Sequence, residues 1–239
     1  MNLHHALYDH QEDEPWSLEI DDGFPEYLYA IYRYMTLGLT VSGLIAYWCA
    51  SSSFYQVIAK EPFILPLLLI APLIIVVNLS TRIDVISIRN AKISFWLFAV
   101  VIGFSFAGIF QIYIGESIAK TFFEVAGAFL ILSLVGFFTK RSLTRIGTFL
   151  LLGLVATILS GVVNLWLASD ALDFVISAVG ILIFSGLTAF DTQMISKRYY
   201  AIHADCDIRN REAILGALNL YLDFINLFLS LLRLSGSKK

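Results

Sequence analysis

The chain has 239 residues, of which 58% are hydrophobic and only 15% are charged, and its mean hydropathy is +0.78. This composition excludes a disordered chain, which needs low hydrophobicity and high charge. The formal net charge of −3 excludes the basic footprint of a nucleic-acid-binding protein, and two cysteines are too few for a disulfide scaffold. A soluble domain this apolar would expose large sticky patches, so an integral membrane protein remains.

The first 27 residues form an acidic segment. They contain eight Asp or Glu and no Lys or Arg, so they carry −8, and the other 212 residues carry +5 to give the total of −3. The segment lacks the apolar core of a signal peptide, and its mix of acids, His and Pro is typical of a solvated chain. We expect residues 1–27 to be a disordered cytoplasmic tail, followed by a membrane domain of residues 28–239.

Apolar runs long enough to cross a bilayer follow the tail. A hydrocarbon core of about 30 Å needs roughly 20 apolar residues per helix. The runs are continuous, without the alternation of a β-barrel, and only helices satisfy their own backbone groups in lipid. We therefore predict an all-α membrane protein, a bundle of seven transmembrane helices, over residues 29–50, 62–81, 91–114, 118–138, 146–168, 171–195 and 213–234.

The distribution of basic residues predicts the orientation in the membrane. Eleven Lys and Arg lie beside the tail and the loops that follow the second, fourth and sixth runs, whereas five lie on the opposite side. Because cytoplasmic loops are enriched in Lys and Arg, the tail is expected in the cytoplasm and the C-terminus outside.

Two acids lie inside the last two runs. Asp191 belongs to GLTAFDTQMI and Asp223 to LNLYLDFINLF. Ionisable residues inside a membrane are costly and usually mark a functional interior. Consecutive runs form antiparallel helices, and Asp223 is about ten residues, or roughly 15 Å, from the start of its run. Both carboxyl groups are therefore expected at a similar depth in the cytoplasmic half.

Polar residues along the last run share one helical face. They are spaced 3, 4, 3, 4 and 3 residues apart, and this spacing predicts a central helix whose stripe faces protein or water. The stripe consists of Gly216, Asn219, Asp223, Asn226, Ser230 and Arg233, and Thr188 contributes to a parallel feature beside Asp191. The alternative for Asn219, Asn226 and Thr188 is hydrogen bonding that merely holds helices together.

A buried pair of carboxyl groups suggests two kinds of chemistry. The pair would titrate as a coupled unit, and carboxylates are hard oxygen ligands suited to Ca²⁺, so a pH-gated cation site is one reading. Arg82, or alternatively Arg89, has the right depth to pair with the acids, although both residues also fit simple membrane anchors. Aspartyl proteolysis is the other reading. Asp223 lies in Tyr-Leu-Asp-Phe rather than in the Gly-x-Gly-Asp context of presenilin-like proteases, so we expect no enzyme.

These motifs resemble the transmembrane Bax inhibitor motif family, the Bax inhibitor-1-like proteins. The similarity covers residues 28 to 235 and includes SFWLFAVVIGFSFAGIF and TKRSLTRIGTFLLLGL. The resemblance implies a seven-helix bundle with the last helix central, in the inner membrane of a bacterium. It places the family's two pH-sensing aspartates on Asp191 and Asp223, and its latch arginine on Arg82.

The resemblance also implies a function. It predicts a pH-sensitive Ca²⁺ leak, with Asp191 and Asp223 as the residues that meet the ion, no resident cofactor, and the lipid bilayer, Ca²⁺ and protons as partners. Some bacterial members resemble modulators of a membrane-bound AAA protease. The alternative function is therefore a non-transporting regulator that binds such a protease or a stress or cell-death factor.

Overall fold

The computed structural model describes the chain except for residues 1–22, 53–54, 56–59, 62 and 202–205. The prediction of an all-helical protein is confirmed for the described residues, whose only extended pairing is an isolated bridge between Tyr113 and Lys238. The helices are α2 (Gly23–Ser51), α4 (Ile64–Arg82), α5 (Ile88–Phe106), α6 (Ile109–Ile112), α7 (Gly115–Phe138), α8 (Thr144–Leu167), α9 (Asp170–Ala201) and α10 (Cys206–Ser235).

Each of the seven apolar runs overlaps at least one of these helices. Five helical stretches within the described residues are long and apolar enough to cross a membrane, namely Ile88–Ile112, Gly115–Phe138, Thr144–Leu167, Asp170–Ala201 and Cys206–Ser235. Ile70–Arg82, within α4, is a shorter apolar stretch. Helix α8 has very few buried residues, whereas most of the apolar stretch of α10 is buried.

The boundary between tail and helical body lies earlier than charge alone predicted. Helix α2 begins at Gly23, so residues 23–27 belong to it, while residues 1–22 of the expected tail lie outside the described part. Phe24 and Tyr27 are buried against α9. The centroid of the Tyr199 ring lies 5.0 Å from that of Phe24 and 5.2 Å from that of Tyr27. Burial of these two rings explains why the helix extends into the acidic segment.

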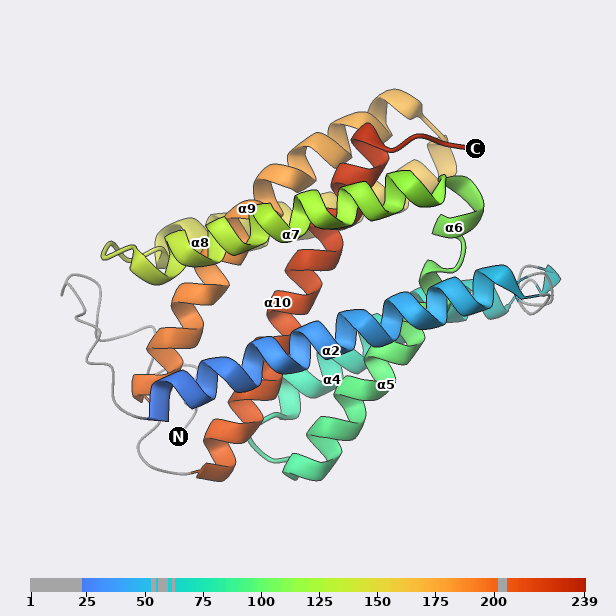
Figure 1. The fold of residues 1–239 in the computed structure, drawn as a ribbon. Helices are drawn as coiled ribbons and strands as arrows, with labels where there is room; N and C mark the ends of the chain where they lie inside the picture. The colour runs from blue at the N-terminus through green and yellow to red at the C-terminus, as the bar shows by residue number, and fades with distance from the viewer. Residues whose placement is uncertain (1–22, 53–54, 56–59, 62, 202–205) are drawn as a thin grey trace.

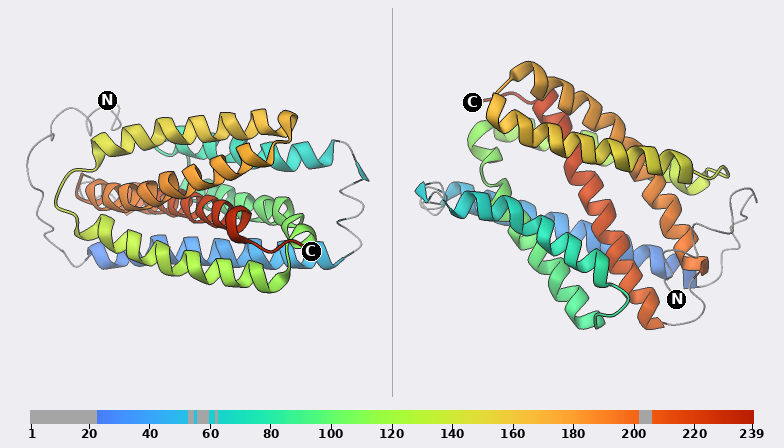
Figure 2. Two further views of the ribbon diagram at one scale, coloured as in Figure 1. Left: turned by 90° about the horizontal axis from the view of Figure 1, so that it is seen from above. Right: turned by 180° about the vertical axis from the view of Figure 1, so that it is seen from behind.

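Helix α10 runs between two groups of helices. In Figure 1 the group of α7, α8 and α9 lies on one side of α10, and the group of α2, α4 and α5 lies on the other. The view from above shows α9 and α10 between a row of α8 and α4 and a row of α7 and α2 (Figure 2). Helix α10 packs against α9, α2, α7, α5 and α4.

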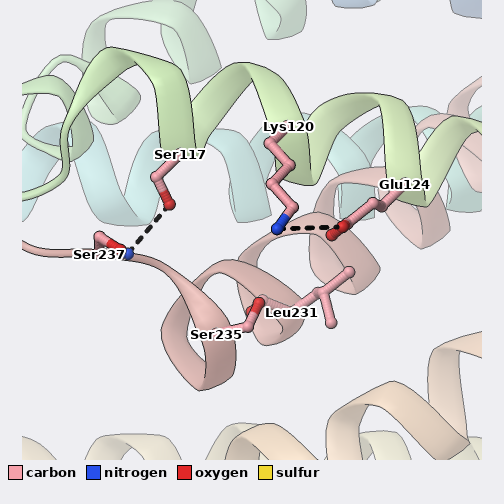
Figure 3. A network of polar contacts seen from close by, with 6 residues as sticks. All are labelled: Ser117, Lys120, Glu124, Leu231, Ser235 and Ser237. Atoms are coloured by element: carbon pink, nitrogen blue, oxygen red, sulfur yellow. Dashed lines mark hydrogen bonds and ion pairs between the residues drawn. The ribbon is translucent and has the colours of Figure 1, made fainter.

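The C-terminal segment is tied to the junction of α6 and α7, far from the start of α2 (Figure 1). The backbone amide of Ile114 donates to the Ser237 carbonyl at 3.1 Å, and that of Lys239 donates to the Ile112 carbonyl at 2.9 Å. The Ser237 amide donates to Ser117 Oγ at 3.0 Å (Figure 3). These bonds fix the end of α10 that lies opposite the α9–α10 connection.

Candidate functional site

Asp191 of α9 and Asp223 of α10 meet within the hairpin that these helices form. Their carboxyl groups lie close enough to interact with each other electrostatically. Asp223 is 5% exposed, and Asp191 is partly buried. A hydrogen bond between the two carboxyl groups would need a proton on one of them, because an ionised carboxylate can only accept hydrogen bonds. The structure thus brings together the two acids that the sequence singled out.

One oxygen of this pair has no hydrogen-bond partner. Asp223 Oδ2 is buried, and none of the described residues donates to it. Buried polar atoms normally have a partner, so an open acceptor at this point is a place where a proton, water or cation can bind. No group of three or more His, Cys, Asp and Glu suited to a metal ion occurs among the described residues. Two carboxylates supply at most four of the six to eight oxygens that Ca²⁺ takes.

The helices around Asp191 approach one another very closely. A Cβ on Gly136 of α7 would lie 2.8 Å from the carbonyl carbon of Ala189, and one on Gly147 of α8 would lie 2.6 Å from Cζ of Phe190. At Gly136 the neighbouring atoms belong to the backbone, so only a residue without a side chain fits there, whereas at Gly147 a larger residue would have to displace the ring of Phe190. Glycines on α7 and α8 therefore hold α9 at close range, directly before Asp191.

Gln193, two residues after Asp191, anchors the connection between α7 and α8. Its side chain is fully buried. Its Oε1 accepts from the Leu143 amide at 2.8 Å, and its Nε2 donates to the carbonyls of Thr139 and Arg141 at 3.0 and 2.9 Å. A single amide thus satisfies three backbone groups of the loop, which fixes the loop to the helix that carries Asp191.

The other polar residues predicted near the pair mostly bond to their own helices. Thr188 is fully buried, and its hydroxyl donates to the Phe184 carbonyl at 2.8 Å. Asn226 is partly buried and donates from Nδ2 to the Leu222 carbonyl at 2.8 Å, while Asn219 is partly buried as well. Thr188 and Asn226 therefore donate hydrogen bonds to backbone carbonyls four residues earlier in their own helices.

A second polar contact ties α10 to α2 and α5. The hydroxyl of Tyr221 lies 2.6 Å from Ser42 Oγ, which also donates to the Ala99 carbonyl at 2.6 Å. The ring of Tyr221 is fully buried and packs edge-on against Phe98, with a centroid distance of 5.1 Å. This contact lies two residues before Asp223 and fixes the helix that carries it.

The structure places a different arginine near the acids from the one the sequence suggested. Arg82 is the last residue of α4 and is exposed, as is Arg89 on α5. Arg198 of α9 is close enough to Asp191 to interact with it electrostatically. Arg198 Nη1 lies 3.3 Å from Glu212 Oε2 of α10. Glu124 is exposed and pairs with Lys120 at 3.9 Å, on the side of α7 shown in Figure 3.

Several of these residues were missed in the sequence, and a sequence signal exists for only some of them. Gln193 is a polar residue within the run that contains Asp191, but its partners are backbone groups of a distant loop, which no sequence pattern reveals. Arg198 follows Asp191 by seven residues, and Glu212 precedes Asp223 by eleven. Each of these spacings returns to the same face of the helix. That periodicity could have identified the pair.

Known proteins similar to the chain cover nearly all of it. The family described as "Inhibitor of apoptosis-promoting Bax1" matches residues 25–239. The chain is 37% identical over 219 residues to the inner membrane protein YbhL of Escherichia coli (strain K12), covering 91% of this chain and 94% of YbhL. It is 37% identical over 220 residues to an uncharacterized protein of Rickettsia prowazekii (strain Madrid E), covering 92% of each chain. The chain therefore belongs to the Bax inhibitor-1-like family of membrane proteins.

Proposed function

We propose that this protein is a pH-gated Ca²⁺ leak of a bacterial inner membrane, gated by Asp191 and Asp223. One observation carries the proposal: two acids from adjacent helices lie close enough to interact inside a helical membrane protein. Intramembrane acids are expensive and are retained mainly where ions or protons pass.

The proposed topology has seven crossings, with residues 1–22 in the cytoplasm and the C-terminus outside. Five long apolar stretches support it, and α2 and α4 supply the remaining two crossings. The start of α2 and the C-terminus lie at opposite ends of the bundle, as an odd number of crossings requires (Figure 1). The excess of Lys and Arg on the side where α2 begins favours the cytoplasm for that side. YbhL is named an inner membrane protein, which supports the same location.

In this topology α10 is the central helix and the wall of the ion path. Its contacts with α9, α2, α7, α5 and α4 support that role. Asp223 lies on the part of α10 whose neighbours in sequence, Tyr221 and Phe224, are also buried. Lipid therefore does not reach the acid, and its charge state depends on the protein interior and on any water that enters it.

Protonation provides the gate. With one proton on the pair, the two carboxyl groups hold each other and tie α9 to α10. When that proton leaves, two like charges in contact repel, and the free oxygens become ligands for a divalent cation. The buried Asp223 Oδ2, which has no partner among the described residues, is the oxygen most ready to receive the ion. Two carboxylates provide a weak, transient site, which suits passage rather than storage.

Ca²⁺ flux into liposomes tests the proposal. Purified wild-type protein should pass Ca²⁺ with a rate that changes with pH. Asp191→Asn and Asp223→Asn should each remove most of that pH dependence, because an amide keeps a hydrogen bond but does not titrate. Asp170→Asn is the matched control, since this acid lies exposed in the first turn of α9 and should leave the pH profile unchanged.

Two results would contradict the proposal. If both buried variants match wild type at every pH, the pair does not gate the protein. If wild type passes no Ca²⁺ at any pH, the protein is no leak, and the non-transporting regulator becomes the better hypothesis.

A further inference from the structure

A partly buried lysine of α9 contacts two hydroxyl groups at the connection between α7 and α8. Lys197 Nζ donates to Ser142 Oγ at 3.1 Å and to Thr144 Oγ1 at 3.4 Å, and these two oxygens lie 2.9 Å apart. No carboxylate of the described residues lies within ion-pair distance of this ammonium group. The Lys197–Ser142–Thr144 cluster therefore keeps a positive charge that no neighbouring acid neutralises.

The hydrogen bonds within this cluster leave two donors unused. Ser142 Oγ accepts from Lys197 and from the Thr144 amide, so both of its lone pairs are occupied and its own hydrogen is donated to Thr144 Oγ1. Thr144 Oγ1 then accepts from Ser142 and Lys197, and no described residue accepts the hydrogen of the Thr144 hydroxyl. An ammonium group has three hydrogens, of which Lys197 uses two here. One O–H and one N–H donor thus remain for an oxyanion.

Three further basic residues lie in the same connection. Residues 139–145 contain Lys140, Arg141 and Arg145, all of them exposed, and no Asp or Glu. The connection lies at the end of the bundle where α2 begins (Figure 1), which the proposed topology places at the cytoplasmic surface of the membrane. Basic groups at this surface attract the head groups of anionic lipids. The local charge therefore favours an anionic ligand.

The amide of Gln193 holds the cluster in place. Gln193 precedes Lys197 by four residues, so the two side chains lie on the same face of α9. Gln193 is fully buried and bonds to three backbone groups of residues 139–143. These bonds fix the backbone on both sides of Ser142. A ligand therefore meets donors that are already positioned, which lowers the entropic cost of binding.

Exposed apolar side chains continue from the cluster along both helices. Phe138 ends α7, and Ile146 and Phe149 lie in the first two turns of α8, with exposed fractions of 69%, 55% and 73%. Phe149 is about 8 Å from Thr144 along the axis of α8. A molecule that joins an anionic phosphate to acyl chains matches both parts of this surface, whereas a free anion matches only the polar part.

We propose that the Lys197–Ser142–Thr144 cluster binds the phosphate of an anionic phospholipid in the cytoplasmic leaflet. The phosphate accepts from the Lys197 ammonium and the Thr144 hydroxyl, and the acyl chains lie along the exposed apolar side chains of α7 and α8. Phosphatidylcholine has the same phosphate but adds a cation, which four nearby positive charges disfavour. The site goes beyond the proposed function, since it involves no ion flux, and only the choice of leaflet depends on the proposed topology.

Lipid binding to the purified full chain tests the site. The protein in a neutral detergent would be titrated with phosphatidylglycerol or phosphatidylcholine, and the bound lipid would be measured by native mass spectrometry. Wild type should bind phosphatidylglycerol severalfold more tightly. One basic residue near an anionic lipid contributes about fivefold to binding, so Lys197→Gln should weaken phosphatidylglycerol binding by about that factor and leave phosphatidylcholine binding unchanged. Thr144→Val removes the unused O–H donor without a change of charge and should weaken phosphatidylglycerol binding about threefold.

Two controls accompany these variants. Lys92→Gln removes an exposed lysine near the start of α5, which belongs to the other group of helices (Figure 1), and should bind phosphatidylglycerol like wild type. Inorganic phosphate at the same concentration as the lipid should not displace it, because inorganic phosphate lacks the chains that contact α7 and α8.

Several outcomes would overturn the lipid site. Equal affinity of wild type for the two lipids would do so, and so would an equal loss of binding in Lys92→Gln and Lys197→Gln. Displacement by inorganic phosphate would show a site for free anions instead. If Lys197→Gln does not fold, Thr144→Val decides, and phosphatidylglycerol binding at the wild-type level overturns the site. A wild type that passes no Ca²⁺ would refute the proposed leak but would not change the result of this titration.

Discussion

Replacement of Gly136 by alanine should separate α7 from α9 just before the acidic pair. Gly136 is buried, and its new Cβ would lie 2.8 Å from the carbonyl carbon and 2.9 Å from Cα of Ala189. These are backbone atoms, which cannot rotate aside as a side chain can. One helix must therefore move by about 1 Å to restore an ordinary van der Waals distance.

The expected loss of stability follows from this geometry. Overpacking of a well-filled interior typically costs about 1 to 3 kcal/mol. For a chain of this size, each kcal/mol lowers the melting temperature by roughly 2 to 4 °C. Gly127 on the same helix is the matched control, because a Cβ there meets nothing within 4 Å. Gly127→Ala should be neutral or slightly stabilising, since alanine favours helix over glycine by up to about 1 kcal/mol.

Thermal unfolding of both variants in the same detergent provides the measurement. Gly136→Ala should melt several degrees below wild type, and Gly127→Ala should melt at or above it. The Ca²⁺ leak of Gly136→Ala should also change, because Ala189 is two residues before Asp191. Equal melting temperatures for the two variants would refute the close approach of α7 and α9.

Two further contacts give predictions of the same kind. Gln193→Ala removes an amide that satisfies three backbone groups of residues 139–143, so we expect a loss of about 2 to 4 kcal/mol and faster hydrogen exchange at the Leu143 amide; exchange at the wild-type rate would show that another group satisfies this amide. Tyr221→Phe leaves Ser42 without its tyrosine partner and should cost about 1 kcal/mol in thermal unfolding, whereas a variant as stable as wild type would mean that water replaces the hydroxyl.

The helices were largely predictable because apolar run length depends on the bilayer, not on tertiary packing. The start of α2 could not be predicted in this way. Its first turns contain Glu26 next to Tyr27, and charge assigned them to the tail. The decisive fact is that Phe24 and Tyr27 bury their rings against Tyr199, a residue more than 170 positions away. No local pattern carries that information, so the boundary needed the three-dimensional structure.

Depth along a helix did not predict which arginine lies near the two acids. Arg82 and Arg198 both lie near the ends of apolar runs that meet the same side of the bundle, and counting residues cannot choose between them. The choice depends on which helix neighbours the acids. Arg198 lies on the helix of Asp191 itself and meets Glu212 on the helix of Asp223, while Arg82 ends α4 and is exposed. The spacings of seven and eleven residues place Arg198 and Glu212 on the same helix faces as the two acids.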